Sequence, residues 1–205
     1  MTHSNHRQGT RDNLKNDWVM LSLPYRGPPH VMEKVEKYNE ICRRHHPINP
    51  DRERAWYIWV FDKRENMEAA LEEIARAELG LPVVVSGLFD EVAGCCRKAG
   101  TAPHTVNHSL GFWGRVEKLP PREVLEITTM CGHGLVAPNL VWHLAEKVRL
   151  DEASAASACQ EMRMMCICDI FNHVRAGGLM ERLVEAIEEG RLAPPQPSRR
   201  EEAAP

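Results

Sequence analysis

The sequence predicts an α/β protein, with about four mostly parallel strands and flanking helices followed by a helical C-terminal lobe. Strand-like and helix-like segments alternate through roughly the first 115 residues, as in right-handed β-α-β units. From residue 121 onward only helical patterns recur. We therefore divide the chain into a polar N-terminal segment (1–16), an α/β domain (17–115), a helical lobe that contains cysteines (116–190) and a disordered tail (191–205).

The predicted strands are short apolar or β-branched segments that end near proline or glycine. The third of them is apolar without a break, which is typical of a strand buried on both faces of a parallel sheet. We therefore place residues 82–85 in the interior of the sheet. The four segments are residues 17–23, 55–61, 81–85 and 104–110.

The predicted helices show apolar residues at helical spacing between charged ones. Gly80 and Gly190 fit positions that directly follow a helix, and Asp151 fits an N-cap. Composition favours disorder for the polar residues 1–16, and the alternative is that His3, His6 and Arg7 fold back over a site. The helical segments are residues 31–43, 63–80, 88–99, 122–128, 138–148, 151–164 and 178–189.

Composition excludes several classes of function. With 205 residues, 43% hydrophobic content and a net charge of −3, the chain is an ordinary globular protein and offers no basic surface for nucleic acid. We expect no membrane partner, because no apolar run reaches the length of a transmembrane helix, and the polar start resembles no signal peptide. The seven cysteines form no secreted disulfide framework, which predicts a reducing cytoplasm.

The cysteines point to a metal centre. Cys166 and Cys168 form a Cys-x-Cys pair that can meet one metal or cluster, and Cys131 lies in Cys-Gly-His-Gly, where bare backbone leaves room for a bulky group. The opposing interpretation is that these are buried structural cysteines, since the spacing matches no standard zinc or ferredoxin motif. We assign Cys159, in an alanine-rich helix, to the core.

Three further residues are candidates for catalysis. His133 can be a fourth ligand, a general acid or a hydrogen-bond donor to a cluster sulfur. His104 and Asn107 lie on the predicted fourth strand, where a small-molecule substrate would meet them near Ser86. His104 and His108 would be about 13 Å apart on that strand, too far to share one metal.

Several phrases resemble an uncharacterised family of bacterial and archaeal proteins that is common in anaerobes. The resemblance implies that Cys131, Cys166 and Cys168 are the recurring cysteines and that Cys159 is not. The family pattern has glycine where this chain has Asp169, and no reaction is attached to it. The phrases are residues 83–92, 104–107, 109–111, 126–134, 166–168 and 170–172.

Three interpretations of the function remain open. In the first, Cys131, Cys166 and Cys168 hold a [4Fe–4S] cluster whose fourth iron is open or bound by His133 or substrate, as in an iron–sulfur lyase or oxidoreductase. In the second, the same cysteines and His133 hold a structural zinc ion. In the third, the chain is a metal-free α/β domain that binds a metabolite or a partner.

Overall fold

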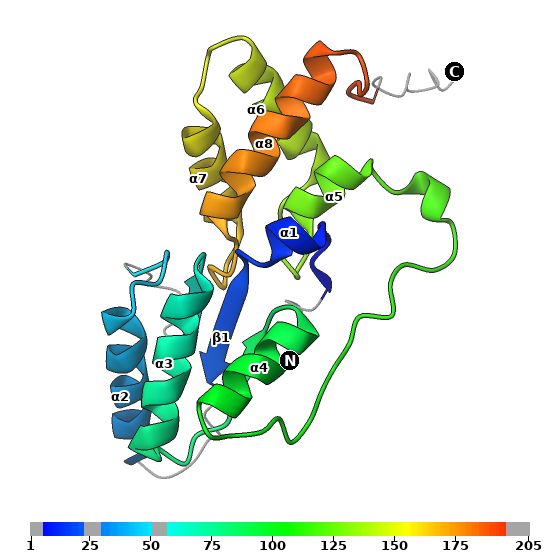
Figure 1. Cartoon of the computed structure of the whole chain (residues 1–205). Coiled ribbons are helices and arrows are strands. Elements are labelled where there is room, and N and C mark those ends of the chain that lie inside the picture. Colours follow the sequence, from blue (N-terminus) through cyan, green and yellow to red (C-terminus); the bar gives the residue numbers. More distant parts are fainter. Residues whose placement is uncertain (1–5, 23–29, 51–56, 196–205) are drawn as a thin grey trace, which may run out of the picture.

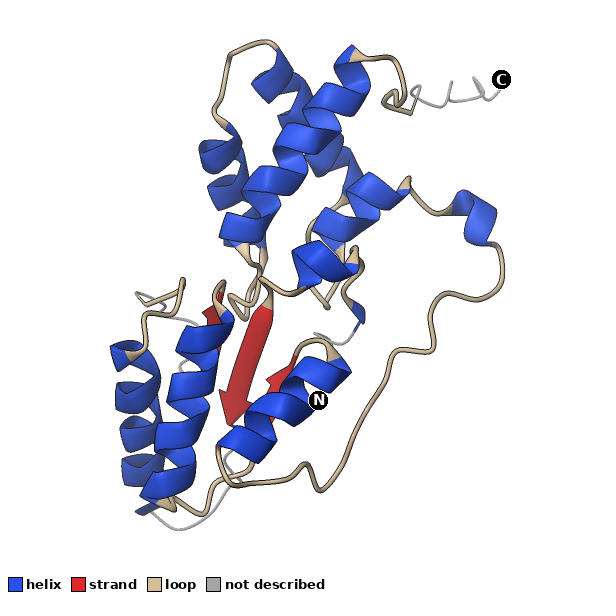
Figure 2. Ribbon diagram, viewed as in Figure 1, coloured by secondary structure: helices blue, strands red, loops and turns tan. Residues whose placement is uncertain are grey.

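The computed structural model describes residues 6–22, 30–50 and 57–195 (Figure 1). The helices between residues 30 and 98 cover one face of a small sheet, and four later helices form the C-terminal lobe, which packs on the other face (Figure 2). The elements, in chain order, are α1 Arg11–Leu14, β1 Trp18–Ser22, α2 His30–Arg44, β2 Ile58–Phe61, α3 Arg64–Ala77, β3 Val83–Ser86, α4 Phe89–Lys98, the 3-10 helix η2 Val116–Lys118, α5 Arg122–Thr128, α6 Pro138–Arg149, α7 Ala155–Met165 and α8 His173–Glu188.

The sheet of the described residues has the strand order β2-β1-β3, and β1 is antiparallel to both neighbours. The prediction of about four mostly parallel strands is therefore wrong. β2 and β3 both run opposite to β1, so they are parallel to each other, but β1 lies between them. The predicted alternation of strand and helix is correct for the first three strands, whereas the pairing of strands is a long-range property that local patterns do not encode.

The interior strand is β1, and the interior place predicted for residues 82–85 is wrong as well. All five residues of β1 are buried, whereas β3 is half-buried at the edge of the sheet. An unbroken apolar run indicates that both faces of a strand are covered, and it does not show that both edges are paired. Val83 and Val85 pack against the core under α2, α3 and α4, while Val84 packs against the core of the C-terminal helices.

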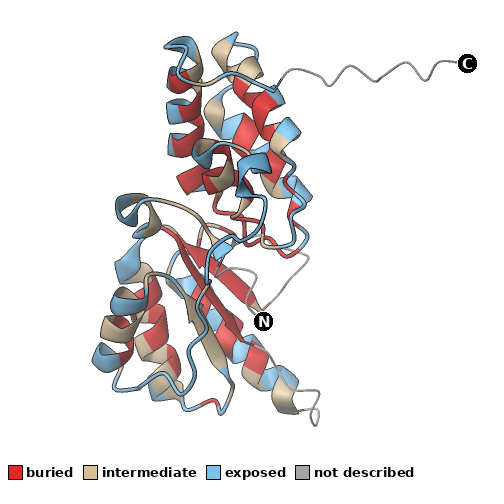
Figure 3. Cartoon of the chain, turned by 90° about the vertical axis from the view of Figure 1, so that its right-hand side faces the viewer, coloured by how far each residue is buried: buried red, intermediate tan, exposed pale blue. Residues whose placement is uncertain are grey.

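The predicted fourth strand is absent from the described residues. Residues 104–110 belong instead to a loop of residues 99–121, which we call the long loop, and Figure 3 shows it as largely exposed. Val106 and Leu110 are the apolar residues that this segment could bury, and they are 50% and 83% exposed. So little apolar area does not offset the entropy lost when such a segment is ordered into a strand.

Two apolar cores meet at β1 because successive side chains of a strand point to opposite faces. Trp18 and Met20 join the core under α2, α3 and α4, and Val19 and Leu21 join the core of α5, α6, α7 and α8. The lobe is therefore packed onto the sheet. The end of α7 and the start of α8 face the sheet in Figure 1, and this places the segment between them next to β1.

Candidate metal centre

Two segments that we call the cysteine loops, residues 129–137 after α5 and residues 166–172 between α7 and α8, meet where the lobe faces the sheet. The Sγ atoms of Cys166 and Cys168 are 3.9 Å apart, and the Nδ1 atom of His133 lies 3.6 Å from Cys168 Sγ. Cys131 lies in the same buried cluster of side chains, and Cys131 and Cys166 each shift the pKa of the other. The three cysteines and the histidine singled out in the sequence therefore form one cluster.

Backbone N–H groups near all three sulfurs lower the pKa of the thiols. Those of His133 and Leu135 have this effect on Cys131, and that of Ile170 has it on both Cys166 and Cys168. The N–H groups of His133 and Leu135 are held near Cys131 by a turn in which Gly134 has a φ of +68° and donates its N–H to the Cys131 carbonyl at 3.0 Å. Such donors stabilise the thiolate form of a sulfur, which is the form that binds metal.

The sulfurs differ in how readily they ionise. The hydrogen bond with Cys166, followed by burial, raises the pKa of Cys131. The pKa of Cys166 is also raised, since its hydrogen bond with Cys131 lowers it less than Cys168 and burial together raise it. The pKa of Cys168 is lowered, chiefly by the hydrogen bond from Cys166. Cys168, beside His133, is thus the sulfur of the cluster whose pKa is lowered.

The second cysteine loop is held by an ion pair inside the lobe. Arg163 donates two hydrogen bonds of 2.6 and 2.8 Å to the carboxylate of Asp169, whose backbone has a φ of +53°. This left-handed conformation suits glycine better than residues that carry a side chain. In this chain the pair with Arg163 holds an aspartate there instead.

Hydrogen bonds to residues beside β1 and β2 tether the same loop. Asn49 donates 3.2 Å to the Asp169 carbonyl and accepts 2.9 Å from the N–H of Val60 in β2, so it joins the loop to the sheet. Asn172 donates to Asn16 O and to the Asp17 carboxylate, at 2.9 and 3.1 Å. The cysteine loop thus depends on both β1 and β2 for its position.

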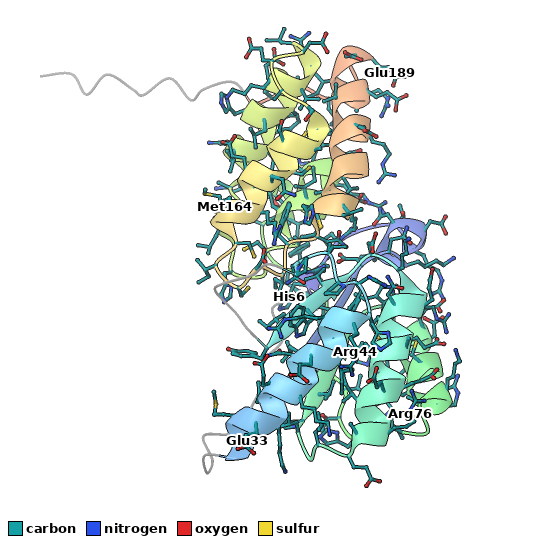
Figure 4. All side chains as sticks on the ribbon, turned by 90° about the vertical axis from the view of Figure 1, so that its left-hand side faces the viewer. His6, Glu33, Arg44, Arg76, Met164 and Glu189 are labelled. Atoms are coloured by element: carbon teal, nitrogen blue, oxygen red, sulfur yellow. The ribbon has the colours of Figure 1, made fainter. Side chains whose placement is uncertain are left out.

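Asp17, whose side chain is fully buried, is the centre of a charged network. It accepts hydrogen bonds from the guanidinium groups of Arg7 and Arg175, the second at 2.6 Å. Burial lowers the pKa of Arg175 and Asp17 opposes that effect. Because Arg7 precedes α1 and Arg175 lies in α8, the network joins the N-terminal segment to the lobe. Residues 6–16, for which composition favours disorder, fold back against the lobe, and His6 lies at the junction in Figure 4.

The other two candidates for catalysis lie elsewhere. His104 and Asn107 line a cavity of about 610 Å³ between β3, α4 and the long loop, together with Ser86. Its lining residues include neither the three clustered cysteines nor His133. The structure therefore brings His133 to the cysteines and keeps His104 and Asn107 apart from them.

The remaining cysteines are core residues. Cys159 is fully buried in the lobe, and burial raises its pKa to about 12. Cys42, Cys95 and Cys96 belong to the core under α2, α3 and α4. Burial raises the pKa of both Cys95 and Cys96, so neither thiol is activated.

The cluster is not a finished ion site. Within the described ranges, no group of three or more His, Cys, Asp or Glu side chains is arranged so that it could hold a metal ion without movement. In a tetrahedral zinc site the Zn–S bond is ~2.3 Å and the Zn–N bond is ~2.1 Å. Two sulfur ligands of one ion are then about 3.8 Å apart, and a sulfur and a nitrogen ligand are about 3.6 Å apart. The two measured separations agree with these values, so it is the remaining ligand geometry that must adjust.

Sequence patterns did not reveal the partners of the groups that support the centre, namely Arg7, Asp17, Asn49 and Arg175, although Arg7 belongs to a segment that could fold back over a site. All four are ordinary polar residues whose partners lie far away in the chain, as with the 158 positions between Asp17 and Arg175. The one local signal was Asn172, which follows the Cys-x-Cys pair and caps α8 through the N–H of Arg175 at 2.9 Å.

None of the described helices is both long and apolar enough to cross a membrane. Comparisons of the chain with family models, with curated proteins and with solved structures gave no match.

Proposed function

We propose that this chain is a metal-binding protein in which Cys131, Cys166 and Cys168, with His133 as the fourth ligand, bind one soft metal ion, for which zinc is the simplest candidate. The observation that carries the proposal is the convergence of three sulfurs and an imidazole from two loops that are separated by two helices. Three thiolates and one imidazole are a standard donor set for tetrahedral zinc.

The local chemistry supports this proposal over an array of ordinary core cysteines. Core thiols such as Cys159 are surrounded by apolar side chains, and their pKa is raised by burial. Backbone N–H groups lie near the clustered sulfurs, and the pKa of Cys168 is lowered. Cys168 is the natural first ligand, because metal binds the thiolate.

The spacing favours one ion over a [4Fe–4S] cluster. In a four-iron cluster each cysteine binds a different iron, so its sulfurs stand farther apart than two ligands of the same ion. The Cys166–Cys168 separation of 3.9 Å is that of two ligands of one ion. An iron–sulfur cluster stays the second candidate because the ligand residues are the same, and it requires the two cysteines to separate.

The role of the ion follows from the number of protein ligands. With His133 bound, four protein ligands close the site, and the ion fastens the first cysteine loop to the second as a structural centre. With His133 displaced, the open position admits water or substrate. His133 is exposed and its turn contains Gly134, so the imidazole has room to move toward the ion or away from it.

Metal analysis of the protein purified without oxygen tests the proposal. We expect a single zinc per chain and, after exchange for cobalt(II), the intense near-ultraviolet absorption of cobalt–thiolate bonds. Cys168→Ala should lose the metal, while Cys159→Ala, which removes another buried thiol of the same lobe, should keep it.

Two results would change the conclusion. Iron together with acid-labile sulfide would replace the single ion with the iron–sulfur cluster. A wild-type protein that retains no metal, or a Cys168→Ala variant that retains as much as the wild type, would refute the metal centre.

A further inference from the structure

Arg7 lies against both cysteine loops although it belongs to the N-terminal segment. Its Nη2 atom donates to the carbonyl oxygens of Met130, at 3.4 Å, and of Ile170, and its Nη1 donates to Asp17. The side chain of Arg7 is 5% exposed. One guanidinium group therefore joins three segments that are distant in sequence.

Both carbonyl groups belong to residues next to the clustered sulfurs. Met130 directly precedes Cys131 in the first loop. Ile170 belongs to the second loop, two residues after Cys168, and its own N–H lowers the pKa of both Cys166 and Cys168. A displacement of either carbonyl therefore moves a ligand or the donor that faces it.

We infer that Arg7 is a positioning residue of the cysteine centre, which fixes the distance between the two cysteine loops through the carbonyls of Met130 and Ile170. The N-terminal segment is on this inference a component of the site. The planar guanidinium group is suited to the task because its donors diverge in a fixed geometry, which a single ammonium group cannot reproduce.

Neighbouring contacts fix Arg7 itself. The N–H of Gln8 donates 2.9 Å to the hydroxyl of Thr129 in the first loop, and the Gln8 carbonyl accepts from Arg175. A side chain at Gly9 would collide with Asn13 and with the Arg175 guanidinium, so glycine allows the segment to approach α8 closely. Arg7 thus enters the site on a backbone that is held on both sides.

The test compares Arg7→Lys, which keeps the charge beside Asp17, with Arg11→Met, a change in the same segment at an exposed arginine paired with Asp90. Circular dichroism and thermal unfolding establish that each variant is folded. Cobalt(II) titration then measures affinity and the thiolate absorption spectrum. Alkylation of the metal-free protein, with mass spectrometry, measures the reactivity of each cysteine.

We expect Arg7→Lys to bind cobalt about 10 to 100 times more weakly, the usual effect of losing a group that orients ligands. Its cobalt spectrum should be altered, and its clustered cysteines should change in alkylation rate relative to Cys159. Arg11→Met should match the wild type. A folded Arg7→Lys protein with wild-type affinity, spectrum and alkylation rates would overturn the inference.

The affinity readout rests on the proposed metal centre, while the alkylation readout does not. If the wild type binds no cobalt, the proposed function fails, and the alkylation rates alone decide the role of Arg7: changed rates support it and unchanged rates overturn it. If Arg7→Lys does not fold, Thr129→Val, which removes the acceptor of the Gln8 N–H, takes its place with the same two outcomes.

Discussion

The cysteine loops and the long loop contain similar residue types, but the cysteine loops are largely buried and the long loop is largely exposed. Both contain histidine, glycine and asparagine outside regular helices and strands. In the cysteine loops, Cys131, Cys166 and Ile170 are 1 to 2% exposed, whereas Leu110 and Trp113 of the long loop are each 83% exposed. The difference comes from distant partners: Asn49, Asp17 and Arg7 bind the cysteine loops, and residues of the long loop are mostly in solvent.

The largest effect should come from removing the carboxylate that anchors this network. Asp17→Ala leaves the buried guanidinium groups of Arg7 and Arg175 without their common acceptor, and breaking a buried ion pair in this way costs about 3–5 kcal/mol. Urea unfolding measures the change. Asp90→Ala, which breaks an exposed pair with Arg11, is the control and should change stability little. Equal stability of both variants would show that the tethers of the cysteine loops contribute nothing.

A matched pair of glycines compares the two kinds of loop directly. Gly134 in the first cysteine loop and Gly111 in the long loop have φ values of +68° and +86°, and neither has an atom within 4 Å of an added Cβ. An alanine forced to keep such a conformation costs about 1–2 kcal/mol. We expect Gly134→Ala to show this loss by thermal unfolding. Gly111→Ala should not, because the long loop can relax; an equal loss there would show that it is as constrained as the cysteine loops.

The pH dependence of the unfolding free energy tests the burial of one core thiol, that of Cys159. Burial raises the pKa of Cys159 to about 12 in the folded protein, while the same thiol in the unfolded chain ionises near its ordinary value of 9.0. The folded state then holds a proton that the unfolded state loses, so stability is fully present below about pH 9 and falls as pH rises toward about 12.

Between about pH 8 and about pH 10 this effect amounts to about 1.4 kcal/mol. Cys159→Ala lacks the titrating thiol, so the difference between its unfolding free energy and that of the wild type should shrink by this amount over the same interval. A constant difference would contradict the burial of Cys159.

The smallest effect should come from the long loop itself. Trp113 is 83% exposed, and its indole N–H donates 3.1 Å to the Leu110 carbonyl within the loop. We expect Trp113→Ser to change the unfolding free energy by less than about 0.5 kcal/mol, as for other exposed positions. A loss above about 2 kcal/mol in calorimetry, outside the range of exposed positions, would show that the loop packs on the rest of the molecule in solution.

Local patterns predicted the elements well and their pairing poorly. The apolar segments around Trp18, Ile58 and Val83 are strands, and most predicted helices are present with shifted ends. The exception is the segment of residues 104–110. Its residues alternate as in a strand, but it pairs with no strand of the described residues. Strand order and direction were missed because they depend on how α2 and α3 return the chain to the sheet, and no local spacing records that.

The cluster itself was partly visible in the sequence, because Cys131, His133, Cys166 and Cys168 form short motifs. Its supports were invisible for a simple reason: a buried Asp17 looks like any other aspartate until its partners are known. The assignment of His104 and Asn107 to the same site rested on the parallel sheet, and the antiparallel arrangement removes that basis. Site predictions that depend on topology inherit its errors.

The Asp17–Arg175 contact also limits how early the fold can be completed during synthesis of the chain. The two residues are 158 positions apart, so at about 5–20 residues per second a ribosome adds the second about 8–30 s after the first. During that interval β1 and the preceding segment exist without α8, and Asp17 has Arg7 beside it but lacks Arg175, its partner in that helix. Chains released before α8 is made should therefore be recognised by chaperones and proteases as incomplete, even though the three described strands have been synthesised.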